Sequence, residues 1–329
     1  MADDRSAAWN KRYEECLRYV EGVVKAVDAG KSLRLGPSAE EFVRPATTAA
    51  GEAAASSKVQ HPAKVVYCAP HPDDESLSGV LALRLSLESG ARVTNVAITL
   101  GSDAGQRSRR LSELESACRA LGFKLVVPTE PVGHAAPSSG FEHVNLTTLH
   151  ERPAEWAAKV DVLKAIFDRE QPDVVLAPHA EDFNTTHIGT HWLVVAALGL
   201  HLEQSGRSPV TFVETEFWHQ LAAPNLMVGV TPATLAMLLI AACEHGGEMT
   251  RNPYHLLAPA RMMDNIRRGS EVVGGQGAAA QRFTFAELYR VAFISGKEVV
   301  EARPGGVVVS PEEKIDAATL ANRFRPQAD

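Results

Sequence analysis

Four polar residues, His71, Asp73, Asp74 and Glu75, stand together in the stretch VVYCAPHPDDESLSGV. They follow a short apolar run that predicts a β-strand and precede a pattern that predicts a helix. An imidazole and a carboxylate are suitable zinc ligands, and a free carboxylate beside them can accept a proton from a metal-activated water. His71 and Asp74, three residues apart, can converge on one point while Asp73 points beside it. The spacing therefore predicts a metal site with an adjacent general base.

A simpler interpretation of the same residues is a helix cap. An Asp at the N-cap and acidic residues in the first turn complement the helix dipole. Capping requires neither His71 nor three adjacent carboxylates beside an apolar strand, so we prefer the functional interpretation.

A second group of polar side chains follows another apolar run, in PDVVLAPHAEDFNTTHIGTHWL. Its members are His179, Glu181, Asp182, Asn184, His187 and His191. His187 and His191 lie four residues apart and share a helix face, so both can bind a metal, or one can bind it while the other orients it or contacts substrate. A single histidine is usually structural, but here six such groups crowd one strand end. The two loops together supply His, Asp and His, the three protein ligands of an open catalytic zinc site.

The elements that must position these loops alternate between strand and helix. The predicted strands are Lys64–Ala69, Val93–Leu100, Lys124–Pro128, Asp173–Ala177 and Val210–Phe217, and the predicted helices are Leu77–Glu88, Ser108–Leu121, Ala154–Arg169 and His187–Leu202. Continuous apolar strands that alternate with helices predict an α/β fold with a mostly parallel sheet flanked by helices. In such sheets ligands bind at the carboxyl ends of the strands, where both polar groups lie.

The two ends of the chain have a different pattern. We expect a helix over residues 8–29 and an Ala/Ser-rich linker over Pro45–Pro62, so that residues 1–62 form an extension, 63–303 the catalytic domain and 304–329 a tail. The C-terminal part is expected to be helical, with a helix starting at Thr231-Pro232 and others near Ala258–Arg268 and Phe285–Phe293.

Two shorter segments carry predictions of their own. In the tail we expect a strand at Val307–Ser310 and then a short helix capped by Ser310. The stretch Pro131–His150 is long for a connection inside a compact domain, which is typical of a lid.

Composition excludes several classes of function. The net charge of −7 argues against nucleic-acid or anionic-membrane partners, which require a basic face. The longest apolar stretch near the middle, Leu235 to Cys243, is far shorter than the roughly 20 residues of a membrane span. The N-terminus has no secretory pattern, and the four cysteines form no CxxC pair. We therefore expect a cytoplasmic protein; a homo-oligomer is compatible with the sequence.

At these two polar groups the sequence resembles the PIG-L/LmbE-like family of zinc-dependent de-N-acetylases. That family comprises the N-acetylglucosaminyl-phosphatidylinositol de-N-acetylases and their bacterial relatives, which include deacetylases of mycothiol and bacillithiol biosynthesis and of certain antibiotics. The resemblance covers about residues 63–220 and extends more faintly to Val291. The matching positions are Pro70 to Glu75 for the motif A/P-H-P-D-D-E; Arg110, Glu113, Ala117, Leu121 and Gly122 for a second motif; and Asn184 to His187 for a third, H-P-D-H.

This resemblance implies a Rossmann-like fold and one Zn²⁺ per chain, or another divalent metal, held by His71, Asp74 and His187. It also implies that Asp73 is the general base. The chain departs from the family at Asn184, which replaces a histidine thought to polarise the carbonyl or protonate the leaving amine. Asn184 can donate a hydrogen bond but not a proton. The proton donor is then His191 or His179, or Asp73 acting twice, and we favour His191 because it shares a helix face with His187.

Substrate contacts are expected from a second set of side chains. Arg110 can anchor an anionic or hydroxyl-rich group, although an ion pair with Glu113 along the helix is an equal alternative. Asp103 lies in the Gly-rich segment Gly101–Gly105, which we interpret as a substrate-side loop. His179 and Asp182 complete the set.

The predicted function is a metal-dependent hydrolase that removes an N-acetyl or other N-acyl group from a small amino-sugar or glycoside-like substrate. Two alternatives remain. One is a metallohydrolase acting on another bond, such as a thioconjugate amidase or an esterase. The other is a non-catalytic metal-binding homologue with a decayed site, which the departure at Asn184 motivates.

Overall fold

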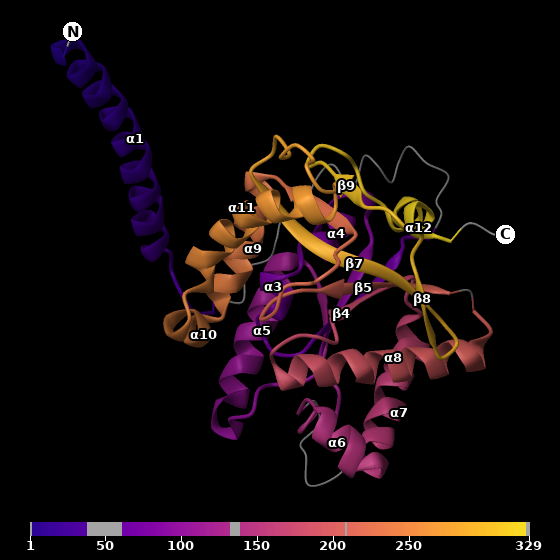
Figure 1. Cartoon of the computed structure of the whole chain (residues 1–329). Helices are drawn as coiled ribbons and strands as arrows, with labels where there is room; N and C mark the ends of the chain where they lie inside the picture. Colours follow the sequence, from indigo (N-terminus) through magenta and orange to yellow (C-terminus); the bar gives the residue numbers. More distant parts are fainter. Residues whose placement is uncertain (1, 38–60, 132–138, 208, 327–329) are drawn as a thin grey trace.

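Short apolar runs rich in β-branched residues form the strands of one mixed sheet, seen in the computed structural model (Figure 1). The structure describes residues 2–37, 61–131, 139–207 and 209–326. The strands are β1 (Lys64–Ala69), β2 (Arg92–Ala97), β3 (Lys124–Val126), β4 (Val174–Pro178), β5 (Val210–Thr215), β6 (Leu226–Val230), β7 (Phe285–Ser295), β8 (Glu298–Glu301) and β9 (Val307–Val309).

Helices connect these strands and flank the sheet. They are α1 (Ala2–Lys31), α3 (Asp74–Leu77), α4 (Val80–Ser89), the 3₁₀ turn η1 (Ala104–Gln106), α5 (Arg107–Leu121), α6 (Leu146–Glu151), α7 (Pro153–Glu170), α8 (Thr185–Ser205), α9 (Pro232–Glu244), α10 (Gly246–Arg251), α11 (Tyr254–Val272) and α12 (Ala317–Phe324). Among the described helices, none is long and apolar enough to cross a bilayer.

The strand order places the two polar loops beside each other. The order is β3-β2-β1-β4-β5-β7-β6-β9, with β8 paired to β7. Strands β1 to β5 pair in parallel, whereas β7 runs antiparallel to its neighbours. From β1 the chain moves outward to β2 and β3 and then returns to β4 on the other side of β1. Ligands of open α/β sheets bind at such a reversal, outside the carboxyl ends of the strands. The predicted α/β class with a mostly parallel sheet is confirmed.

Two apolar layers hold the sheet between the helices. Alternate residues of β1 serve opposite layers: Val65 and Tyr67 belong to one, Val66 and Cys68 to the other. The first layer includes residues of α4, α5, α9 and α12, and the second includes residues of α7 and α8. Because β1 is buried on both faces, its sequence is continuously apolar rather than alternating.

The C-terminal part differs from the prediction. The region Phe285–Phe293 is not a helix; it lies in β7, which pairs with β5, β6 and β8. Its charged residue Glu287 interrupts the apolar residues, so the sequence did not show a strand pattern here. That side chain is buried because it accepts a hydrogen bond from the Val80 N–H at the start of α4 (3.1 Å). Strand β6, whose five residues are all buried, was not predicted.

The expected tail joins the same sheet. Strand β9 pairs in parallel with β6, in agreement with the predicted strand at Val307. The prediction of a helix directly after Ser310 is wrong, since the next helix, α12, begins at Ala317. Asp316 caps it by accepting a hydrogen bond from the Thr319 N–H (2.8 Å). Ser310 instead accepts a hydrogen bond from the Glu313 N–H (3.3 Å) in a turn.

At the other end of the chain, α1 contains the helix expected over residues 8–29 and projects away from the sheet (Figure 1). Most of the expected linker Pro45–Pro62 lies outside the described residues.

Candidate active site

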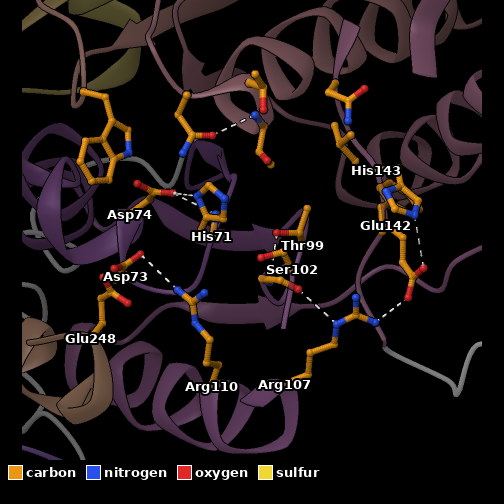
Figure 2. Close-up of a pocket in the computed structure, with 18 of the residues that line it drawn as sticks. His71, Asp73, Asp74, Thr99, Ser102, Arg107, Arg110, Glu142, His143 and Glu248 are labelled. Atoms are coloured by element: carbon orange, nitrogen blue, oxygen red, sulfur yellow. Dashed lines mark hydrogen bonds and ion pairs between the residues drawn. The ribbon is translucent and has the colours of Figure 1, made fainter. Parts of the chain in front are cut away.

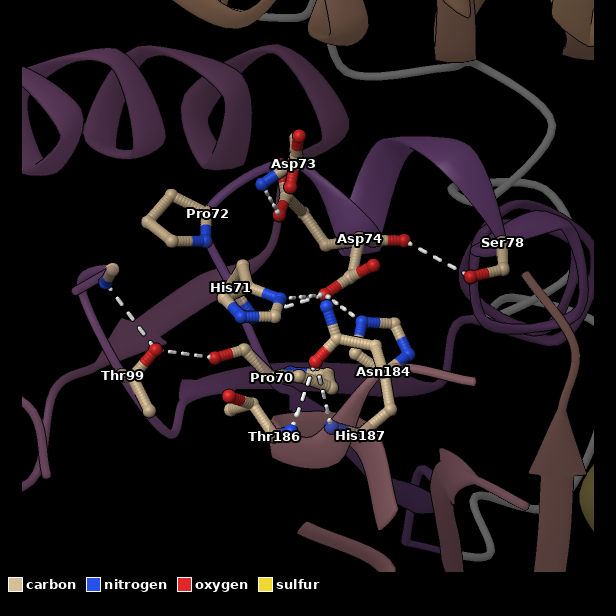
Figure 3. Close-up of polar contacts among 12 residues, drawn as sticks. Pro70, His71, Pro72, Asp73, Asp74, Ser78, Thr99, Asn184, Thr186 and His187 are labelled. Atoms are coloured by element: carbon tan, nitrogen blue, oxygen red, sulfur yellow. Dashed lines mark hydrogen bonds and ion pairs between the residues drawn. The ribbon is translucent and has the colours of Figure 1, made fainter. Parts of the chain in front are cut away.

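The loop after β1 folds back so that His71 and Asp74 face each other (Figure 3). The backbone N–H of His71 donates a hydrogen bond to Oδ2 of Asp74 (2.9 Å), and its Nδ1 lies 3.6 Å from the same oxygen. Asp74 begins α3, so the short helix holds its carboxylate against the end of β1. Burial alone would raise the pKa of Asp74, but the neighbouring His187 and His71 hold it below its usual value.

The loop after β4 brings His187 to the same place. Asn184 caps α8: its side-chain oxygen accepts hydrogen bonds from the N–H groups of Thr186 (2.9 Å) and His187 (3.4 Å). In the first turn of this helix, Nε2 of His187 lies 3.5 Å from Oδ2 of Asp74. Its Nδ1 lies 3.5 Å from Oδ2 of Asp182 on the opposite side of the ring. The imidazole is thus oriented between two carboxylates.

These side chains fit a divalent metal ion of the zinc type. The ligand atoms of His71, Asp74 and His187 all lie within 4.8 Å of one another. The Nε2 atom of His187 is buried and has no hydrogen-bond partner among the described residues. Leaving such an atom unpaired is costly, and a metal ion would satisfy it. Metal-binding histidines commonly direct their other ring nitrogen to a carboxylate, as His187 does toward Asp182.

Asp73 is a strained, buried carboxylate beside this set. Its backbone φ is 127°, in a region that L-residues rarely adopt and that is commonly found at functional sites. Burial, followed by the negative charge of Asp74, raises the pKa of Asp73 well above its ordinary value, although Arg110 opposes this. A divalent cation beside it would offset part of the rise. A carboxylate with a raised pKa can exchange a proton near neutral pH, as a general base must.

Three of these residues, His71, Asp73 and Asp74, line a cavity of about 470 Å³ (Figure 2). That volume is within the range of small-molecule sites, roughly 300–1,000 Å³. Polar side chains line much of it: Thr99, Ser102, Arg107, Arg110, Glu142, His143, Asn145, Asn184, Thr185, Thr186, Glu248 and Arg251. Aromatic side chains, Phe141, Phe217 and Trp218, line another part. The cavity therefore suits a ligand with both polar groups and a ring.

Arg110 faces the site rather than its own helix. Its guanidinium donates a hydrogen bond to the carbonyl of Pro72 (2.9 Å) and lies 3.9 Å from the Asp73 carboxylate. The structure describes no pair between Arg110 and Glu113. Glu113 instead accepts hydrogen bonds from Arg109 (2.5 Å) and from the Gly247 N–H (3.0 Å). Arg110 is thus placed to hold the loop that carries Asp73.

Four other predicted residues lie outside the described cavity lining. His191 directs Nδ1 toward the carbonyl of Pro178 (3.0 Å), and burial lowers its pKa to about 4. Nε2 of His179 lies 3.0 Å from the carbonyl oxygen of His219. Asp103 accepts a hydrogen bond from the Gly105 N–H (2.9 Å) at the start of η1. Asp182 lies behind His187 and not in the cavity.

Sequence reasoning missed other residues of the site. Phe141 to Asn145, inside the segment predicted as a lid, form part of the cavity wall, whereas residues 132–138 of that segment lie outside the described residues. Glu142 could have been found as a polar residue in an overlong loop. Glu75 and His245, 2.7 Å apart and both buried, lie 170 residues apart in the chain, and no local signal joins them.

Comparison with known proteins identifies one family match. Residues 66–198 match the model of the family described as GlcNAc-PI de-N-acetylase, PIG-L. No protein of curated function matches the chain.

Several solved structures are similar to this chain. The conserved protein TT1542 from Thermus thermophilus is 19% identical, over 77% of this chain and 100% of that one, with a TM-score of 0.49. GalB, the 4-carboxy-2-hydroxymuconate hydratase from Pseudomonas putida, is 16% identical over 70% and 96%, with a TM-score of 0.49. An N,N'-diacetylchitobiose deacetylase from Pyrococcus horikoshii is 17% identical over 70% and 84%, with a TM-score of 0.47. Similarities at this level transfer no reaction to this chain.

Proposed function

Residues 66–198 belong to the PIG-L family of de-N-acetylases, and from this premise we propose that the protein is a zinc-dependent hydrolase of N-acyl groups. The observation that carries the proposal is the convergence of His71, Asp74 and His187 on one point, with the strained carboxylate of Asp73 beside them. The substrate class we propose is an N-acetylated amino sugar carrying a further ring.

A zinc ion held by His71, Asp74 and His187 would supply Lewis acidity, lowering the pKa of a water molecule and polarising the amide carbonyl. Asp73 takes the proton from the attacking water as the new C–O bond forms. It then returns the proton to the nitrogen as the C–N bond breaks, giving a carboxylic acid and a free amine. One carboxylate thus handles both proton transfers, because His191 and His179 are engaged elsewhere.

Asn184 and Arg110 assist without transferring protons. The side-chain oxygen of Asn184 is occupied by the cap of α8, so its amide nitrogen is the group that can donate to the developing oxyanion. Arg110 holds the carbonyl of Pro72 and lies near the Asp73 carboxylate, which keeps that carboxylate ionised enough to accept a proton.

The aromatic part of the cavity supports the choice of substrate. Trp218 is 46% exposed and lines the cavity. Its ring meets Phe217 edge-on (centroids 5.1 Å, 81°) and Tyr254 in the same way (6.0 Å, 83°). An indole braced by two rings is preorganised to stack a further sugar or aryl ring. Opposite charges elsewhere in the lining, on Arg107 and Glu142, suit the hydroxyl groups of a sugar.

The non-catalytic alternative is less well supported by the geometry. A non-glycine residue at φ 127° costs on the order of 1–3 kcal/mol. Such strain is found mainly at functional sites, which favours an active enzyme over a non-catalytic homologue.

The proposal is tested by measuring acetate and amine release from N-acetylglucosamine and its phenyl glycoside, with and without added zinc. We expect zinc-dependent release of both products in equal amounts. Hydrolysis of esters or thioconjugates alone would point to the other metallohydrolase, and zinc binding without any turnover would point to the non-catalytic homologue.

A further inference from the structure

We propose that His245, acting through Glu75, is a positioning residue that fixes the backbone of the base Asp73. The inference rests on the proposed function for the role of Asp73. His245 lies outside the segment that matches the family model, so the C-terminal part of the chain would help to set the catalytic geometry.

A chain of two hydrogen bonds joins the residues. The backbone N–H of Asp73 donates to Oε2 of Glu75 (3.0 Å), and Nε2 of His245 lies 2.7 Å from Oε1 of the same carboxylate. The side chain of Glu75 is fully buried, and His245 is 1% exposed. With both oxygens engaged, the Glu75 carboxylate cannot rotate without losing a buried hydrogen bond, which is costly.

The strained conformation of Asp73 explains why such a brace is needed. A residue at φ 127° keeps that conformation only when its surroundings over-determine it. The carbonyl of Asp73 accepts hydrogen bonds from the Ser76 N–H (3.0 Å), the Ser76 hydroxyl (2.7 Å) and the Leu77 N–H (3.1 Å). These bonds fix one side of the residue. Glu75 fixes the other side, and His245 fixes Glu75.

His245 is itself held at a junction that reaches the cavity. It follows α9, where its N–H donates to the carbonyl of Ala242 (3.1 Å). Its own carbonyl accepts from the N–H groups of Glu248 (3.0 Å) and Met249 (2.9 Å) and so begins α10. Helix α10 carries Glu248 and Arg251, both of which line the cavity. His245 therefore links the cavity wall formed by α10 to the base.

The test compares His245→Leu, which removes the ring nitrogen, with His245→Gln, which keeps a donor. For His245→Leu we expect kcat to fall by about 10- to 10²-fold, the scale of a misplacement near 1 Å, with KM and zinc content unchanged. His245→Gln should recover most of the loss. A crystal structure of His245→Leu should show Asp73 displaced while His71, Asp74 and His187 keep their places.

His201→Leu is the matched control. His201 is equally buried and forms a pair of the same length with Asp168 (2.7 Å), but neither residue belongs to the site. Its loss should lower the melting temperature without changing kcat. The proposal is overturned if Asp73 is unmoved in His245→Leu, or if kcat falls equally in both variants. If the wild-type protein hydrolyses no amide, the proposed function fails, whereas the position of Asp73 in the variant still decides the inference.

Discussion

Asp182 and Asp74 flank the ring of His187 on opposite sides, with Oδ2 of Asp182 3.5 Å from Nδ1 and Oδ2 of Asp74 3.5 Å from Nε2. With Nδ1 facing Asp182, the ring presents Nε2 to the metal position. Asp182 is fixed in turn, because its other oxygen accepts a hydrogen bond from the Asn184 N–H (2.8 Å).

Replacing Asp182 should therefore weaken metal binding without removing a ligand. For Asp182→Asn we expect zinc affinity to fall by about 10- to 100-fold, the usual effect of losing a carboxylate behind a ligating histidine. Competition with a chelator of known affinity measures this. Asp168→Asn, which loses a carboxylate facing His201 away from the site, is the control; equal affinities in the two variants would show that Asp182 does not orient His187.

Asn184 is expected to contribute as a neutral donor only. Asn184→Ala should lower kcat by about 10- to 10²-fold, comparable to or somewhat less than the loss of one oxyanion donor. Because the same substitution removes the cap of α8, it should also cost about 1 kcal/mol of stability. Asn184→Asp keeps a capping oxygen but has no donor, so it separates the two roles. If Asn184→Asp has wild-type kcat, the residue only caps the helix.

Trp218 should determine preference for a substrate with a second ring. Trp218→Ala is expected to raise KM for the phenyl glycoside of N-acetylglucosamine by about 10-fold, the scale of one stacking contact, and to leave hydrolysis of N-acetylglucosamine nearly unchanged. Phe183→Ala is a fitting control, since Phe183 is also exposed but does not line the described cavity. An equal effect of Trp218→Ala on both substrates would argue against a stacking site.

Glu214 should make stability depend on pH. Burial raises its pKa from 4.5 to about 7, although Arg290 opposes the rise. The folded state therefore retains a proton that the unfolded state has released, so this contribution to stability is complete below pH 4.5 and is lost as the pH rises through about 7. Glu214→Gln cannot release this proton. Between pH 4.5 and pH 8, its free energy of unfolding should therefore rise by on the order of 3 kcal/mol relative to that of the wild type.

Urea unfolding at pH 5 and pH 8 measures this difference. Glu301→Gln removes an exposed carboxylate that also pairs with Arg290, and its effect should not depend on pH in this range. A constant difference between Glu214→Gln and the wild type at both pH values would contradict the prediction.

The parallel half of the fold could be predicted because its signals are local. Strand β1 is buried on both faces, so its residues are continuously apolar, and Asp73 to Glu75 follow it at the sheet edge where ligands bind. The antiparallel half was harder to predict, although β6 is also a continuous buried apolar run. Strand β7 contains Glu287, a buried carboxylate whose distant partners, Val80 and Arg261, become apparent only in the folded structure.

In the site too, some residues could be predicted from local sequence and others only from the folded structure. His71, Asp74 and His187 could be proposed from two short stretches, because each stretch ends a parallel strand. The orientation of a ring could not be predicted from spacing: His191 shares a helix with His187, yet its Nδ1 faces the carbonyl of Pro178. Likewise Glu75 meets His245 only because α9 packs beside α3.

We propose that, of the adjacent carboxylates Asp73 and Asp74, Asp73 is the base and Asp74 is a metal ligand. The most direct test is zinc content measured together with kcat in Asp73→Asn and Asp74→Asn. We predict that Asp73→Asn keeps about one zinc per chain but loses about 10²-fold or more in kcat, whereas Asp74→Asn loses the metal. Equal loss of zinc in both variants, or turnover in Asp73→Asn close to that of the wild type, would contradict the account.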